Sequence, residues 1–119
     1  MPSVSVLPDG SLGVAFYDRR NGPWELDVYA ARVSFDGGFH ASTNVRITQG
    51  TSPVGDILFL KPGHSSCFYP GRFFGDYIGT AAEGNGDLCI VWADTQAHVY
   101  PRTDIWFARV RLPLLNARR

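Results

Sequence analysis

DVYAARVSFDGG, residues 27–38, is the stretch that decides the fold. Its first seven residues are rich in β-branched and aromatic side chains, which favours an extended strand. Residues 34–38 are turn formers, because Asp can hydrogen-bond its own backbone and Gly adopts positive φ at little cost. A near copy of the strand half returns as DIWFARV at residues 104–110. We therefore expect repeated β units, with this strand and turn at the outer corner of one unit.

Two further blocks of sequence repeat in a similar register. DGSL at residues 9–12 aligns with NGDL at residues 85–88, and FYD at residues 16–18 aligns with WAD at residues 92–94. An internal repeat of four-stranded sheets is typical of a β-propeller. The offset is long for one unit, and we attribute the excess to an inserted loop at residues 49–71, which is rich in Gly and Pro.

The expected architecture is all-β, with antiparallel four-stranded meanders that form about two blades of a propeller. Alternation and turn residues predict strands at residues 4–7, 12–17, 26–33 and 44–48, then 73–82, 88–92 and 103–112. We divide the partial propeller, residues 1–119, into a blade (1–48), the inserted loop (49–71), a second, incomplete blade (72–112) and a tail (113–119). A closed β-sandwich of the same length is the alternative. Since a blade cannot bury both faces alone, we expect further blades or copies of this chain as partners.

Composition excludes several classes of partner. Eleven Lys and Arg residues balance eleven Asp and Glu residues, so a neutral chain exerts no long-range attraction on nucleic acid or an anionic membrane. No apolar run is long enough for a transmembrane span. The N-terminus lacks a signal-peptide pattern, as a fragment would, which leaves localisation open; a secreted or periplasmic location is suspected for a full-length parent.

Cysteine and histidine positions give little sign of a metal or cofactor. Cys67 and Cys89 allow one disulfide, but Cys89 falls in an apolar strand pattern, which favours a buried free thiol. His40, His64 and His98 are widely spaced loop residues without metal-ligand spacing. We expect no metal and no cofactor.

The turn at residues 34–38 resembles the Asp-box, or BNR repeat, of sialidase-like proteins, which reads Ser-x-Asp-x-Gly-x-Thr-Trp. Ser34, Asp36 and Gly38 match it, whereas His40 and Ala41 stand where Thr and Trp are usual. FYDRR at residues 16–20 and FGDYIGTAA at residues 74–82 also resemble the last blades of bacterial sialidase-like propellers. The resemblance spans residues 8–112, about two blades of the six in such a ring. It implies that the box links the third and fourth strands of a blade, where its Asp and Ser side chains tie the turn's amides.

The resemblance also implies a glycan-directed site. A sialidase-type glycosidase uses a Tyr nucleophile, an Asp acid/base and an Arg cluster that binds the substrate carboxylate. Tyr77 and Asp76 are then the candidate catalytic residues. The candidate substrate-binding residues are Arg72, Arg19, Arg20 and Trp24. The structural alternatives are that Asp76 caps a turn, Tyr77 packs between blades, and Arg19 and Arg20 form a solvated loop pair.

Other polar and aromatic residues are better explained by architecture. Asp18 and Asp94 recur at equivalent positions, as do Asp27 and Asp104, and recurrence in each unit indicates a structural role. Trp92 and Trp106 fall at strand positions and are expected in the core.

The expected function is that of a sialidase-like glycoside hydrolase, of exo-α-sialidase type, in a longer parent. The alternative is a non-catalytic carbohydrate- or protein-binding module. Because a sialidase site draws residues from several blades, we expect no activity from this stretch alone.

Overall fold

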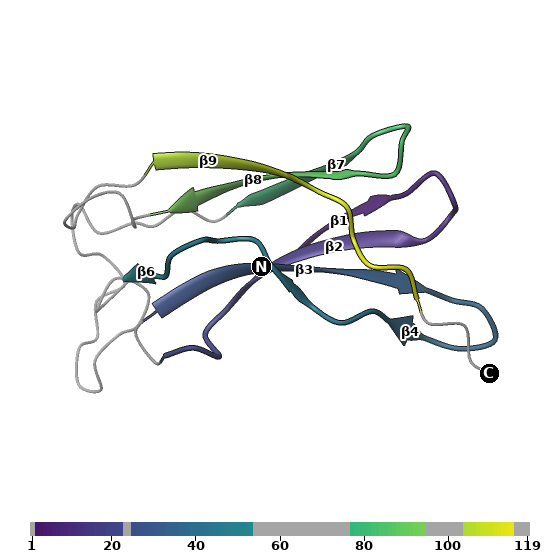
Figure 1. Ribbon diagram of the computed structural model, residues 1–119, viewed down its shortest axis with the longest axis horizontal. Coiled ribbons are helices and arrows are strands. Elements are labelled where there is room, and N and C mark those ends of the chain that lie inside the picture. Colours follow the sequence, from purple (N-terminus) through teal and green to yellow (C-terminus); the bar gives the residue numbers. More distant parts are fainter. Residues whose placement is uncertain (1, 23–24, 54–76, 95–103, 116–119) are drawn as a thin grey trace, which may run out of the picture.

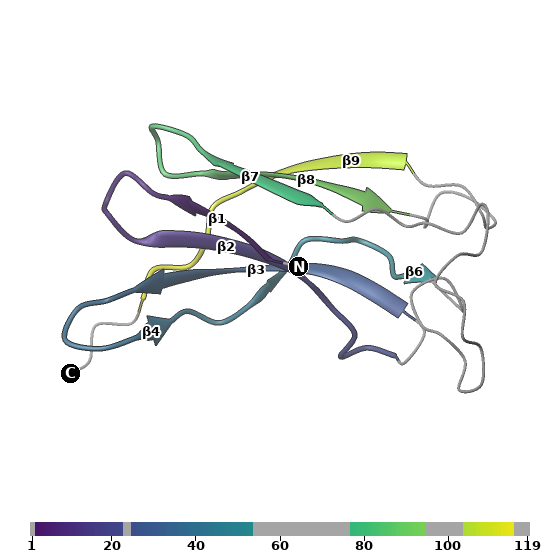
Figure 2. The same ribbon diagram turned by 180° about the vertical axis from the view of Figure 1, so that it is seen from behind.

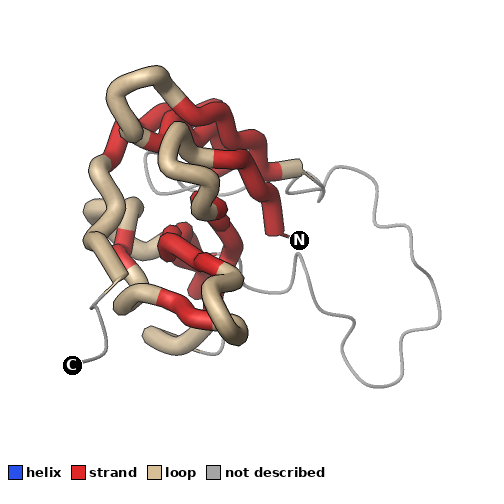
Figure 3. Tube along the Cα trace, turned by 90° about the vertical axis from the view of Figure 1, so that its right-hand side faces the viewer, coloured by secondary structure: helices blue, strands red, loops and turns tan. Residues whose placement is uncertain are grey.

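The computed structural model describes residues 2–22, 25–53, 77–94 and 104–115. These residues form strands joined by turns and contain no helix (Figure 3). The strands are β1 (Pro2–Val6), β2 (Leu12–Asp18), β3 (Glu25–Ser34), β4 (His40–Ala41), β5 (Val45–Arg46), β6 (Ser52–Pro53), β7 (Ile78–Ala82), β8 (Leu88–Asp94) and β9 (Asp104–Val110). The all-β prediction is confirmed.

The strands form two antiparallel sheets. Sheet 1 has the order β1-β2-β3-β4, and β5 and β6 also pair with β3; sheet 2 has the order β7-β8-β9. In Figures 1 and 2 sheet 2 lies along sheet 1, with β7 beside β1. The predicted fourth strand at residues 44–48 is shorter than expected, since only β5 lies within it. β4, β5 and β6 are short segments that pair with β3 at successive places along its length. β6 falls inside the segment expected to be a loop.

Sheet 2 repeats the first three strands of sheet 1, residue for residue. Val6 pairs with Leu12 as Ala82 pairs with Leu88. At the far end of the meander Asp18 pairs with Asp27, and Asp94 pairs with Asp104. β1 and β7 therefore belong to the repeat as well, although their sequences share little. The predicted register is confirmed, and it extends over the whole three-stranded meander.

The turns that join the first two strands of each unit are also equivalent. Leu7 N–H donates to Ser11 O at 2.8 Å, and Glu83 N–H donates to Asp87 O at 2.9 Å. Gly10 and Gly86 occupy the same place in the two turns, with φ of 82° and 87°. These positive values favour glycine because a side chain would crowd the backbone there.

One core joins the two sheets. Its apolar centre includes Ala15, Val28 and Ala30 from sheet 1 and the larger Leu88, Ile90 and Trp92 from sheet 2, all buried. The predicted core position of Trp92 is thus confirmed, and Trp106 packs partly buried against the same cluster. A Cβ on Gly13 would lie 2.8 Å from Leu88 Cδ1. Glycine therefore lets the second sheet approach this closely.

β1 points its side chains in an unexpected direction. The hydroxyls of Ser3 and Ser5 lie 2.9 and 3.0 Å from the Thr80 hydroxyl, so the serines face sheet 2. Val4 and Val6 alternate with them and are 57% and 66% exposed on the far side of sheet 1. In a two-sheet molecule that was complete by itself, alternation would place these valines inside and the serines outside.

Two local expectations are wrong. Cys89 is a free thiol but is only half-buried, because its side chain points to the outer side of sheet 2.

In the turn after β3, neither the Ser34 hydroxyl nor the Asp36 carboxylate forms a hydrogen bond among the described residues. The His40 ring instead approaches Asp36 O, with Nε2 at 3.0 Å. The Phe35 and Phe39 rings meet edge to face with their centroids 5.0 Å apart.

Candidate functional site

The candidate residues that can be placed lie at one end of the two sheets. Arg19 and Arg20 follow β2 directly, and Tyr77 directly precedes β7. β2 ends and β7 begins at the end opposite the β1–β2 and β7–β8 turns (Figure 1). Arg72, Asp76 and Trp24 lie outside the described residues. The predicted site is therefore described only in part.

Arg20 pairs with Asp18 at the end of β2 and lies over the Tyr29 ring of β3. Its guanidinium forms an ion pair with Asp18, and its backbone N–H donates to Asp18 Oδ1 at 2.7 Å. Arg20 Cζ also lies 4.2 Å from the centroid of the Tyr29 ring, within cation–π range. The hydrogen bond from the Arg20 side chain, only partly offset by desolvation, lowers the pKa of Asp18. The structural role expected for Asp18 is confirmed by its bond to this loop amide, and Arg20 remains solvent-accessible above Tyr29.

Asp27 is the centre of a buried polar cluster on β3. It is 1% exposed, and its Oδ1 accepts hydrogen bonds from Arg46 Nη2 at 2.7 Å and Thr48 Oγ1 at 2.8 Å. Asn21 Nδ2 donates to Oδ2 and also to the Tyr29 hydroxyl, the latter at 3.0 Å. Burial tends to raise the pKa of Asp27, but hydrogen bonds from Arg46, Asn21 and Thr48 outweigh it and the pKa is lowered. The carboxylate is thus ionised and compensated, as a structural role requires.

A second buried carboxylate, Asp94, ties the two sheets together at this end. It is fully buried, accepts a hydrogen bond from the Trp92 indole Nε1 at 2.9 Å, and accepts another from the Ser52 hydroxyl. Because Ser52 lies on β6 of sheet 1, this bond crosses between the sheets. The structural role expected for Asp94 is confirmed by these two side-chain hydrogen bonds.

The Tyr17 hydroxyl makes a second connection between the sheets. It donates to Ala93 O at 3.0 Å and accepts from Ala93 N–H at 3.1 Å. Burial, together with the charge of Asp94, raises the pKa of Tyr17 to about 12 despite the hydrogen bond with Ala93. The hydroxyl stays protonated at neutral pH and serves as a fixed link.

Tyr77 stands apart from these networks. It is 83% exposed, so it does not pack against the described part of the chain. Asp104, by contrast with its repeat partner Asp27, is an exposed residue at the start of β9. The four paired charges of this end, on Asp18, Arg20, Asp27 and Arg46, cancel one another. The exposed groups at this end include the Arg20 guanidinium and the Tyr77 phenol.

Sequence reasoning missed the partners of the buried carboxylates. Asn21, Arg46, Thr48 and Ser52 lie in loops or short strands, and no motif marks them. One signal was available: Arg46 and Thr48 are two positions apart in an extended segment, so they share a face. Their approach to Asp27 depends on how that segment crosses β3.

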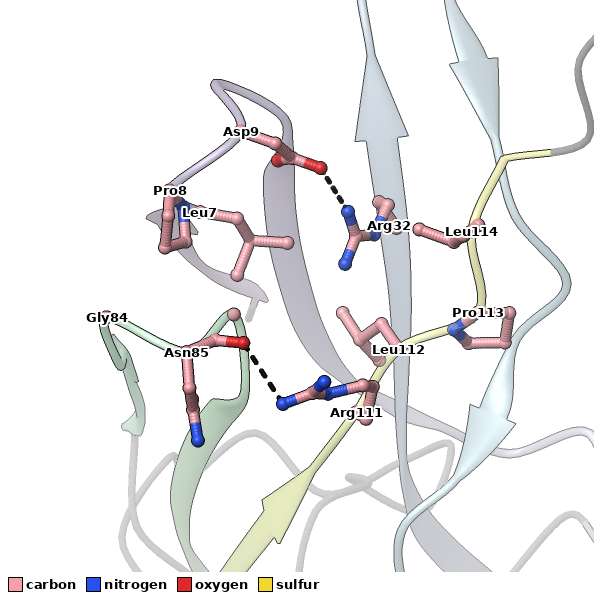
Figure 4. A pocket seen from close by; sticks show the side chains of 11 residues that line it. Leu7, Pro8, Asp9, Arg32, Gly84, Asn85, Arg111, Leu112, Pro113 and Leu114 are labelled. Atoms are coloured by element: carbon pink, nitrogen blue, oxygen red, sulfur yellow. Dashed lines mark hydrogen bonds and ion pairs between the residues drawn. The ribbon is translucent and has the colours of Figure 1, made fainter.

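A pocket of about 590 Å³ opens at the opposite end of the sheets (Figure 4). It lies between the two equivalent turns and the chain that follows β9, and Leu7 and Leu112, both 2% exposed, form its apolar wall. Arg32 and Arg111 contribute guanidinium groups, but Arg32 pairs with Asp9 and Arg111 with Asp87. Hydrogen bonds from Ser11 and the charge of Arg32 lower the pKa of Asp9. The pocket carries balanced charge and contains none of the predicted site residues.

Neither a metal cluster nor a membrane helix is found in the described segments. No group of three or more His, Cys, Asp or Glu side chains there has the arrangement of a metal site. Within the same residues, no helix is long and apolar enough to cross a membrane.

Comparison of the chain with protein-family models, curated proteins and solved structures finds no significant match.

Proposed function

We propose that this chain forms part of a sialidase-like β-propeller of six blades and that the assembly is directed at glycans. The observation that carries the architectural part is the repeat of the three-stranded meander, in which the second sheet packs on the first through non-equivalent faces. Such stacking can continue in both directions, as in a ring of blades, whereas a closed sandwich would leave polar outer faces. The Asp-box resemblance of residues 34–38 supports the same conclusion, since that turn links β3 to β4.

The glycan-directed part rests on the polar side chains at the loop end of the sheets. Arg20 offers a planar guanidinium that fits a sugar carboxylate, and its contact with the Tyr29 ring holds it at this end of the sheets. Tyr77 is exposed immediately before β7, the first strand of the second unit. In the sharper form of the proposal, a longer protein that contains this chain is an exo-α-sialidase-type glycoside hydrolase, with Tyr77 and Asp76 as catalytic residues. Arg19, Arg72 and Trp24 then complete the contacts with the substrate.

A non-catalytic binding module is the second candidate function. It is favoured by the pairing of Arg20 with Asp18 and of Arg46 with Asp27, which leaves no cluster of uncompensated cations among these four groups. Such a module would bind a carbohydrate or protein at the same end without a chemical step.

Titration of the isotope-labelled chain with a sialoside, followed by NMR, tests the proposal. We expect chemical-shift changes at Arg20 and Tyr77, and roughly 10- to 100-fold weaker binding in Arg20→Ala because a charge-assisted hydrogen bond contributes roughly 1.5–3 kcal/mol. The matched control is Arg111→Ala at the opposite end, which should bind as the unmodified chain does. Shifts that appear equally at both ends, or none at millimolar sialoside, would overturn the proposal.

A fluorogenic sialoside separates the two candidate functions. Hydrolysis by a longer protein that contains this chain, abolished by Tyr77→Phe, would establish the hydrolase. Binding at Arg20 without any hydrolysis would establish the binding module.

A further inference from the structure

Both sheets present apolar outer faces. The front face, on the side of sheet 1 away from sheet 2, consists of Val4, Val6, Leu12, Val14 and Phe16. The back face, on the side of sheet 2 away from sheet 1, consists of Ala81, Cys89, Val91, Ile105 and Phe107. Val4 and Val6 are more than half exposed on the front face, and Ile105 and Phe107 are 78% and 62% exposed on the back face. Contiguous apolar surfaces of this kind mark interaction sites.

The repeat relates these two open faces to the interface already inside the molecule. Leu12, Val14 and Phe16 of the front face occupy the positions in sheet 1 that Leu88, Ile90 and Trp92 occupy in sheet 2. The latter three are the residues with which sheet 2 packs on sheet 1. The front face is therefore the counterpart of the surface that sheet 2 buries.

The back face has the reciprocal relation. Ile105 and Phe107 occupy the positions of Val28 and Ala30. Val91 stands in the place of Ala15, and Cys89 in that of Gly13. Those sheet 1 residues receive sheet 2 within the molecule. The chain thus carries both halves of one interface, one half open on each side.

We propose that a second copy of this chain docks its front face on the back face of the first, head to tail. The contact repeats between copies the packing of sheet 2 on sheet 1 within a copy, so Leu12 lies over Cys89 as Leu88 lies over Gly13. The inverted alternation of β1 fits this arrangement, because Val4 and Val6 become buried.

Such a contact is heterologous, since each copy uses a different face towards each neighbour. It yields a closed ring where the rotation closes and an open filament where it does not. With two sheets in each copy and roughly four to eight sheets in closed propellers, a ring holds two to four copies. This inference does not depend on glycan binding.

Two face variants test the proposal. The front-face variant carries Val4→Glu and Val6→Glu, and the back-face variant carries Ile105→Glu and Phe107→Glu. All four positions are exposed in the single copy, so each variant should keep the fold, which near-ultraviolet circular dichroism checks. We expect the unmodified chain to assemble in light scattering, and each variant alone to be monomeric because every head-to-tail contact then includes one damaged face.

Mixing the two variants gives the decisive result. The intact back face of one variant and the intact front face of the other should form a heterodimer of one copy each that grows no further. If either variant alone still dimerises, the contact joins like faces and the head-to-tail proposal is overturned. If the unmodified chain is monomeric at millimolar concentration, a second copy is not the occupant of either face.

A third variant and a thiol probe exclude non-specific association. Phe35→Glu with Phe39→Glu removes exposed aromatic surface from the turn after β3, which belongs to neither face, and should leave the assembly unchanged. The Cys89 thiol, followed by mass spectrometry during alkylation, should be protected in the unmodified assembly. Protection should be lost in the front-face variant, although that variant does not alter the surroundings of Cys89 within its own copy. Unchanged alkylation in the unmodified assembly would place the contact elsewhere.

Discussion

At the scale of single residues, the described part of the chain uses its buried polar groups for structure. Asp27 is ionised inside the protein because Arg46, Thr48 and Asn21 together replace the water that it loses. Leaving such a carboxylate without its donors would cost several kcal/mol. The exposed Asp36, to which the Asp-box resemblance assigns a role in holding the turn, makes no hydrogen bond through its side chain among the described residues.

Substitution of Asp27 by Asn should destabilise the protein and change its response to acid. Because the pKa of Asp27 is lowered in the folded state, its contribution is present above the unfolded pKa of about 3.9 and is lost as pH falls through the folded value. We expect Asp27→Asn to lower the free energy of unfolding at pH 7 by about 2 kcal/mol, the value of a charge-assisted hydrogen bond. Urea denaturation between pH 3 and pH 7, followed by tryptophan fluorescence, should show a flatter acid limb for the variant.

Asp36→Asn is the matched control for this prediction. Its side chain is exposed, so the substitution should change the free energy of unfolding by less than about 0.5 kcal/mol. A loss at Asp36 as large as that at Asp27 would show that the Asp-box carboxylate, and not the Asp27 cluster, holds this unit together.

At the scale of elements, the repeat is a meander of three strands whose first turn has a fixed hydrogen-bond pattern. In the first unit Asp9 Oδ1 accepts from Ser11 N–H at 3.0 Å, and in the second Asn85 Oδ1 accepts from Asp87 N–H at 3.0 Å. An Arg on the third strand then reaches the turn in each unit, from Arg32 to Asp9 and from Arg109 to Asp87. Hydrogen bonds between residues this close in the chain can be predicted from sequence, and the DGSL and NGDL motifs predict these two turns.

Glycine substitutions in the two equivalent turns should have equal effects. Gly10→Ala and Gly86→Ala each force a side chain into the left-handed region at φ near 82° and 87°, and we expect each to cost about 1–2 kcal/mol. Gly84→Ala is the control, because a Cβ there would meet no atom within 4 Å and the φ of Gly84 is not in that region. Thermal unfolding of the three variants measures the difference. A near-zero effect at one of the two turns would contradict their equivalence.

At the scale of the whole molecule, two sheets are held together by an apolar core and by a few hydrogen bonds that cross between them. Tyr17 to Ala93 and Ser52 to Asp94 lie at the loop end, while Ser3 and Ser5 meet Thr80 along β1 and β7. The outer faces remain apolar, so the same forces that join the two sheets are available for joining a third. The proposed assembly of copies therefore depends on the fold as a whole.

Removal of the Tyr17 hydroxyl should weaken the junction of the sheets. Tyr17→Phe leaves the Ala93 N–H and C=O without this partner, and we expect a loss of about 1–3 kcal/mol at pH 7. The pKa of Tyr17 is raised from 10 to about 12 in the folded state, so its contribution is complete below pH 10 and is lost as pH rises towards 12. Denaturation at alkaline pH should show this decline in the unmodified protein and a weaker decline in Tyr17→Phe.

The exposed Tyr77 provides the comparison for Tyr17. Tyr77→Phe should leave the free energy of unfolding at pH 7 unchanged, since its side chain does not pack against the described residues. Equal destabilisation by the two substitutions would contradict the assignment of Tyr17 as the link between the sheets.

The sequence by itself determined the longer strands, the two equivalent turns and the repeat. These features depend on residues that are close in the chain. Period-two alternation, positive-φ glycines and Asx turns each involve only a few consecutive residues. Alternation states which side chains share a face of a strand, but it does not state which face meets a neighbour. For β1 the tertiary structure decided that the serines turn inward and the valines outward, because the serine hydroxyls hydrogen-bond with the Thr80 hydroxyl of sheet 2.

The tertiary structure alone also decided the polar networks. Asp27 meets Arg46 and Asp94 meets Ser52 only after strands far apart in the chain cross, and hydrogen bonds near 3 Å depend on that crossing to within a fraction of an ångström. The same crossing fixed the two outer faces. The front face is the counterpart of the surface with which sheet 2 packs on sheet 1, and the back face is the counterpart of the surface that receives it. DVYAARVSFDGG thus specifies one strand and one corner, while packing between sheets specifies what that strand faces.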